Sequence, residues 1–206
     1  MAKKANKVKF NLKNTHYSLL TISEDGTPTF GTPVPMPGSV SISLDANGEP
    51  ENFYADGGVY YVINNNCGYD GDLELALIPE SFHTDVLKET LDSKGVLIEN
   101  SEVELAAFAL LFEFDGDQKH IRHVLYNCSA SRPGIEGKTN EDSKEVQTEK
   151  LSLKAVPLAN GMVKAKTGNT TDATTYADWY KAVYVPAAES DAATQSAAKP
   201  AKSVKE

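Results

Sequence analysis

The histidines are the first residues of this chain whose chemistry could matter, because a pair of them can hold a metal ion. Of the four in the chain, His120 and His123 lie three apart in a segment whose alternating apolar residues predict a strand. Side chains three apart on a strand point to opposite faces, so these two imidazoles cannot share a metal. Neither a cysteine nor a carboxylate stands at a ligand spacing from them. We therefore expect no metal and no other cofactor.

Motifs for catalysis or phosphate binding are broken or absent. Gly137-Lys138-Thr139 matches the end of a phosphate-binding loop, but the first glycine of G-x-x-x-x-G-K-T would fall at Arg132. No apolar helix follows the threonine, as that loop requires. The sequence contains neither the G-x-S-x-G nucleophile motif nor the H-E-x-x-H zinc motif. These observations favour a protein that is not an enzyme.

Three carboxylates form a regular row. Asp70, Asp72 and Glu74 alternate along a segment that predicts a strand, so they share one face of it. They lack the oxygen-rich loop spacing of a calcium site. Two interpretations stay open: a solvated strand face, and a surface whose function is to be negative. The run Glu113, Asp115 and Asp117 is equally acidic.

The charge of the chain limits its partners. It holds 29 acidic and 20 basic residues, for a formal net charge of −9, and five of its lysines lie in residues 1–13. Binding to nucleic acid through phosphates needs a basic surface. We therefore expect the body of the protein to repel DNA. No apolar run approaches the roughly 18 residues of a membrane span, so no membrane partner is expected.

A long segment between two strands organises the predicted fold. Residues 39–45 and 72–78 alternate between apolar and polar side chains, which predicts two half-buried strands. The intervening residues, about 46–69, exceed the length of an ordinary loop. They are also too apolar for a solvated connection, so we interpret them as an arm that docks outside its own domain. The residues assigned to subunit contacts or ring stacking are Phe53, Tyr54, Val59, Tyr60, Tyr61 and Ile63.

The arm is expected to become ordered only when it meets other subunits. Freezing its ~24 residues costs on the order of 25–50 kcal/mol of backbone entropy. At ~25 cal/mol per Å², roughly 1,000–2,000 Å² of apolar burial would offset that cost. Only a large contact with neighbouring subunits supplies such an area.

The remaining patterns predict a mainly β protein: an antiparallel β-sandwich or barrel flanked by one α-helix, with the arm as a long inter-strand hairpin. We expect a basic N-terminal arm at residues 1–13, one domain at 14–186 and a disordered C-terminal tail at 187–206. The helix is predicted at about 79–94, with an apolar stripe along one side. The other predicted strands are 15–22, 95–99, 107–114, 119–130, 144–156, 162–166 and 181–185, with a helical turn within 170–180.

Several stretches closely resemble the major tail proteins, or tail-tube proteins, of long non-contractile-tailed bacteriophages of Gram-positive bacteria. They are TFGTPVPMPGSVSISLDANGEPENFYADGGVYYV, GYDGDLELALIP, FALLFEFDG, RHVLYNCSASRPGIEGKT and KAVYVP. The resemblance runs in order from about residue 10 to 186. It lies in unusual loop sequences, not in a catalytic motif.

The resemblance implies a virion protein made in the host cytoplasm. Six subunits of such proteins close a ring, and rings stack into a tube around a tape-measure protein, with terminator and tail-tip proteins at its ends. DNA later passes through the lumen without specific binding. We expect Asp70, Asp72 and Glu74 to face that lumen.

Two other classes of protein stay open. A β-sandwich adhesin or carbohydrate-binding module would use the Tyr60–Tyr61 pair as a sugar-stacking surface. A tail terminator or connector would form one ring and stop, whereas the long arm favours repeated stacking.

Overall fold

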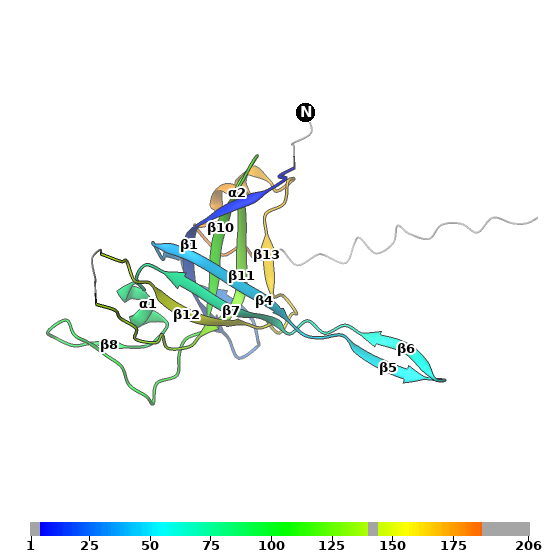
Figure 1. Cartoon of the computed structure of the whole chain (residues 1–206), viewed down its shortest axis with the longest axis horizontal. Coiled ribbons are helices and arrows are strands. Elements are labelled where there is room, and N and C mark those ends of the chain that lie inside the picture. The colour runs from blue at the N-terminus through cyan, green and yellow to red at the C-terminus, as the bar shows by residue number, and fades with distance from the viewer. Residues whose placement is uncertain (1–4, 140–143, 187–206) are drawn as a thin grey trace, which may run out of the picture.

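The computed structural model describes residues 5–139 and 144–186 and is dominated by one antiparallel sheet (Figure 1). The predicted tail at 187–206 lies outside the described residues. The sheet has nine strands in the order β2-β1-β10-β11-β12-β7-β4, with β13 paired to β11 and β3 paired to β1. Its strands are β1 (Lys9–Ile22), β2 (Pro28–Phe30), β3 (Val34–Pro35), β4 (Ser39–Asn47), β7 (Gly68–Leu75), β10 (Phe108–Gly116), β11 (Ile121–Ala130), β12 (Glu149–Ala155) and β13 (Lys164–Lys166). The mainly β prediction is confirmed.

The sheet curls so that its last strand, β4, comes into contact with β1 without pairing to it. The two halves of the curled sheet enclose the larger core, which includes Tyr17, Leu73, Phe108 and Leu151. A smaller core, including Tyr126 and Trp179, covers the opposite face of β10 and β11. The β10–β11 hairpin is therefore buried on both sides, as expected for the most apolar segment of the chain.

The N-terminal segment is not a free basic arm over its described part. Residues 9–13 belong to β1, where Lys9 pairs with Gly116 and Lys13 with Glu113 of β10. Asn11 and Asn14 adopt positive φ values of 57° and 53° at two register shifts. Asparagine tolerates this conformation better than most residues, so the strand can bend without ending.

The helix predicted at about 79–94 is much shorter. Helix α1 (Glu80–Asp85) buries Phe82, and Val86 and Leu87 follow it into the core. The next residue, Lys88, has a φ of +59°, which ends the helical path. The chain then forms a small exposed hairpin of β8 (Thr90–Leu91) and β9 (Leu97–Ile98), so Leu91 leaves the predicted apolar stripe and lies exposed.

The C-terminal part packs on the smaller core without adding a strand. Helix α2 (Ala173–Asp178) begins at Asp172, whose carboxylate accepts a hydrogen bond of 2.8 Å from the Thr175 amide. Trp179 follows the helix and is buried in the smaller core. The strand predicted at 181–185 is wrong, because no strand forms there. No helix in the described part of the chain is long and apolar enough to cross a membrane.

Residues 46–69 form a hairpin that projects far from the body, at the right of Figure 1. Its strands are β5 (Glu51–Ala55) and β6 (Gly58–Ile63), which form a separate two-stranded sheet among the described strands. Asp56 and Gly57 join them with φ values of 51° and 78°, the signs required by the tight turn that suits a hairpin. The arm therefore has regular structure in the single chain, which corrects the expectation that it orders only on stacking.

Candidate assembly surfaces

The arm exposes every large apolar side chain predicted to make subunit contacts. Tyr60 is 71% exposed, and the other predicted contact residues lie between 43% and 65%. Phe53 pairs with Tyr61 across the hairpin, and its ring meets that of Tyr60 edge-on at 6.5 Å between centroids. Val62 is also exposed and extends the same surface. The single chain thus presents an apolar surface against which no other residue of 5–139 and 144–186 is packed.

The base of the arm is held rigidly against the sheet. Gly68, with a φ of +105°, lies where the returning strand of the arm enters β7. A Cβ atom here would lie 1.8 Å from the Ala155 carbonyl oxygen, so no other residue fits. The side-chain amide of Asn47 donates a hydrogen bond of 2.7 Å to the Asp70 carboxylate. The backbone amide of Cys67 donates one of 2.8 Å to the backbone carbonyl of Asn47. The direction of the arm is therefore fixed by its base.

Asp70, Asp72 and Glu74 share one exposed face of β7, as their spacing predicts. The face continues onto β4 and β12, which flank β7. Asp72 accepts hydrogen bonds from Ser152 at 2.8 Å and Lys150 at 2.9 Å. Glu74 accepts them from Ser41 at 2.8 Å and from the Thr148 side chain at 2.5 Å.

These contacts keep the row negative. The Lys150 ammonium and then the Ser152 hydroxyl hold the pKa of Asp72 below its usual value. Hydrogen bonds from Thr148 and then Ser41 lower the pKa of Glu74 in the same way. Asp70 has a more distant cation, with 4.0 Å between its carboxylate and the Lys154 ammonium. The result is a face of carboxylates, hydroxyls and two lysines, and sequence reasoning missed the lysines.

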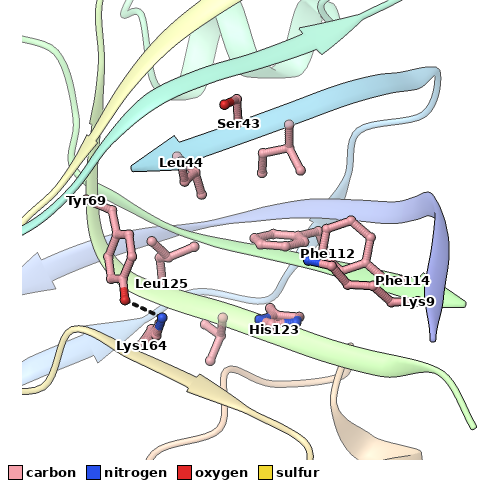
Figure 2. Close-up of a pocket in the computed structure, with 11 residues that line it drawn as sticks. Lys9, Ser43, Leu44, Tyr69, Phe112, Phe114, His123, Leu125 and Lys164 are labelled. Atoms are coloured by element: carbon pink, nitrogen blue, oxygen red, sulfur yellow. Dashed lines mark hydrogen bonds between the residues drawn. The ribbon is translucent and has the colours of Figure 1, made fainter. Parts of the chain in front are cut away.

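A groove of about 340 Å³ opens between the free side of β4 and strands β10 and β11 (Figure 2). Its apolar wall includes Ile42, Leu44 and Leu125. His123 and Phe112 are stacked in parallel at 5.1 Å, and Phe114 meets the same imidazole edge-on at 5.6 Å. Sequence reasoning missed this groove because its lining comes from six strands that are far apart along the chain.

Two lysines lie at the groove against aromatic rings. The Lys9 ammonium lies 4.5 Å from the centre of the Phe114 ring, and that of Lys164 lies 4.2 Å from the Tyr69 ring. Lys164 also donates a hydrogen bond to the Tyr69 hydroxyl, drawn in Figure 2. Burial lowers the pKa of His123 to about 4, and the charges of Lys166, Lys9 and Lys164 add to that effect. The groove therefore combines a neutral imidazole with positive charge.

The histidines considered for metal binding lie apart. His120 precedes β11 and its Nδ1 atom lies 2.6 Å from an Asp115 carboxylate oxygen, whereas His123 lines the groove. Within the described ranges, no group of three or more histidine, cysteine or acidic side chains could hold a metal ion.

No family model matches the chain, and no curated protein matches it either. Among solved structures, it is similar to the tube-terminating cap of the anti-feeding prophage, with a TM-score of 0.44 and 6% identity over 80% of this chain and 95% of that one. It is also similar to the sheath/tube terminator of an extracellular contractile injection system in its extended state, with a TM-score of 0.38 and 6% identity over 79% and 99% of the two chains. A chain of the 6-fold symmetrised anti-feeding prophage baseplate gives a TM-score of 0.41 and 10% identity over 81% and 99%. These TM-scores are too low to carry an argument about function.

Proposed function

We propose that this chain is a structural protein of a bacteriophage tail, and that it polymerises as stacked six-subunit rings into the tail tube. The observation that carries the proposal is the arm, which projects from the body with all its large apolar side chains exposed. The resemblance of its loop sequences to tail-tube proteins supports the same role.

The arm is suited to contacts between subunits. A lone two-stranded hairpin is marginally stable in water, and large exposed apolar patches mark interaction sites. Each fully buried aromatic side chain contributes about 1.5–3 kcal/mol. Docking Phe53, Tyr54, Tyr60 and Tyr61 against another copy would therefore stabilise both the hairpin and the contact.

Ring closure would use the open edges of the sheet. Strand β4 ends the pairing order, so one side of its nine residues has no paired strand in the described part of the chain. An exposed edge of this length invites pairing with another chain, and rotation into a closed ring satisfies every edge. Stacking along the axis stays open, which gives a filament of fixed width.

The lumen would be lined by the face that carries Asp70, Asp72 and Glu74. Duplex DNA carries one negative charge per ~1.7 Å, so a basic lining would bind it at each step. A lining of carboxylates and hydroxyls instead lets DNA slide without specific binding. During assembly the same lumen would enclose the tape-measure protein, with tail-terminator and tail-tip proteins bound at the two ends of the tube.

Negative-stain electron microscopy of the purified protein at high concentration tests the proposal. We expect hollow tubes of uniform diameter with a regular axial repeat. The triple substitution Phe53→Ser, Tyr60→Ser and Tyr61→Ser should abolish them while leaving the body folded. The matched control is Leu91→Ser, Val96→Ser and Ile98→Ser, which removes exposed apolar side chains from the other projecting hairpin and should leave tubes intact.

The same images distinguish the alternatives. Single rings that do not stack would identify a terminator or connector. A monomer that is absent from virion tails and binds glycans would identify an adhesin or carbohydrate-binding module.

A further inference from the structure

We propose that the groove between β4 and β10–β11 is the receptor for the arm of a neighbouring copy of this chain. This inference rests on the proposed function and assigns the surface that the arm contacts. The groove joins two properties that no other described pocket combines: an aromatic wall and two lysines whose ammonium groups lie over aromatic rings.

The charges of the two surfaces are complementary. Residues 46–68 contain three acidic residues, Glu49, Glu51 and Asp56, and no basic one. Lys9 and Lys164 form no ion pair within the described residues, although acidic residues outnumber basic ones in the chain. Their ammonium groups lie over rings at the groove, where an incoming carboxylate can reach them. None of the residues that line the groove is acidic.

The apolar surfaces are complementary as well. The wall offers the rings of Phe114 and His123, with the buried Phe112 stacked on the imidazole, and aromatic pairs add about 0.5–1.5 kcal/mol beyond their buried area. A volume of about 340 Å³ is small for a whole hairpin and suits a few side chains. The aromatic side chains near the end of the arm, Tyr54 and Tyr60, are the expected occupants.

The arm of the same chain does not fill this groove. Leu44 and Tyr69 lie in the groove wall and flank the base of the arm, which then runs away from the body (Figure 1). Its aromatic residues are exposed in the single chain. Nine residues of extended strand reach about 30 Å, so the arm meets a groove on another copy. An arm that leaves one groove and enters the next is a head-to-tail contact, which continues indefinitely.

Cysteine cross-linking of the full-length protein tests this placement, in a Cys67→Ser background because Cys67 is exposed and Cys128 is buried. Protein carrying Tyr60→Cys is mixed with protein carrying Ile42→Cys, which lines the groove. We expect disulfide-linked dimers on oxidation under assembly conditions. The matched control replaces Ile42→Cys by Ser93→Cys, in the loop between β8 and β9 at the opposite end of the molecule, and should give none.

Charge reversal provides a second measurement. Lys9→Glu with Lys164→Glu should raise the protein concentration needed for assembly at least tenfold. Adding Glu49→Lys with Glu51→Lys in the same chain should bring that concentration part of the way back to the wild-type value. Lys94→Glu with Lys138→Glu, both outside the groove, is the control and should change little.

The outcomes separate the two proposals. Tubes that need the arm but give cross-links only to Ser93→Cys, or that tolerate groove charge reversal, would overturn the groove and leave the tube function standing. Wild-type protein that never forms rings or tubes and is absent from virion tails would overturn the proposed function and, with it, this inference.

Discussion

The β10–β11 hairpin and the arm have similar sequences and opposite surroundings. FALLFEF in β10 and GVYYVI in β6 are both nearly continuous apolar runs, and an Asp-Gly pair lies at the end of each hairpin. Residues 108–113 are all buried, whereas every residue of β6 is exposed. Continuous apolar runs are typical of strands covered on both faces. The proposed docking of the arm on other copies would give it the covering that β10 and β11 find within their own chain.

The largest expected effect on stability comes from removing one aromatic side chain from each hairpin in turn. The side chain in β10 is buried in the core, whereas the one in the arm is exposed. Phe108→Ala removes a fully buried ring and should lower the free energy of unfolding by about 3–5 kcal/mol. Tyr60→Ala in the arm should change it by less than ~0.5 kcal/mol. Urea unfolding of the monomer measures both. A large destabilisation by the arm substitution would mean that the arm packs within its own chain.

A second test measures how the free energy of unfolding depends on pH through His123, which lies in the groove wall. The pKa of His123 falls from 6.5 to about 4 on folding, because burial disfavours the imidazolium. The unfolded chain then binds the extra proton, so stability is full above pH 6.5 and is lost as pH falls towards 4. The loss is about 3 kcal/mol over that window. Unfolding curves at pH 7 and pH 4.5 measure it.

The matched variant isolates this histidine from the carboxylates, which also titrate in acid. His123→Phe keeps an aromatic ring against Phe112 and removes the imidazole. Its stability should fall less between pH 7 and pH 4.5 than that of the wild type. Equal losses in the two proteins would show that burial of His123 does not govern this pH dependence.

The sequence predicts those parts of the fold that depend on neighbours along the chain. Alternation places Leu73 and Leu75 inside and Asp72 and Glu74 outside, and these four lie as predicted. Leu77, which continues the same alternation, was also expected inside, but it is exposed because β7 ends at Leu75. The helix prediction failed because the i, i+4 pairs Phe82/Val86 and Leu87/Leu91 fit a helix, and only the positive φ of Lys88 sends Leu91 elsewhere. Strand alternation is a local pattern that the sequence shows, whereas the path after Lys88 depends on tertiary packing.

The groove could not be predicted for a related reason. Lys9 belongs to a segment that reads as a basic tail, and it reaches Phe114 only because β1 pairs with β10. Tyr69 and Lys164 are 95 residues apart. No short-range pattern brings such residues together, so only the strand order reveals the site.

A smaller test concerns the turn of the arm. Gly57 has a φ of +78°, and a side chain at this position would meet no other atom within 4 Å. Gly57→Ala therefore reports backbone strain alone, of about 1–2 kcal/mol. We expect the critical concentration for assembly to rise about tenfold while the unfolding of the body stays unchanged. Gly95→Ala, at the turn between β8 and β9 with the same φ, is the control and should leave assembly unaffected.

The smallest expected effect on stability comes from substitutions in the row of Asp70, Asp72 and Glu74. These substitutions change the charge of an outer face and leave the packing of the core unchanged. Asp70→Asn, Asp72→Asn and Glu74→Gln together leave Lys150 and Lys154 without their carboxylate partners, so the face becomes net positive even with Asp45. Exposed ion pairs contribute about 0–1 kcal/mol each, and the amides still accept hydrogen bonds from the neighbouring hydroxyls. Tubes should therefore form normally.

If this face lines the lumen, virions carrying the variant should eject DNA several-fold more slowly, most clearly at low salt, because the unpaired lysines attract phosphates. Glu102→Gln with Glu104→Gln is the charge control outside the face. Ejection at the wild-type rate would place the row outside the lumen. The other acidic run does not replace it as a complete lining, because its Glu113 is buried in an ion pair with Arg122.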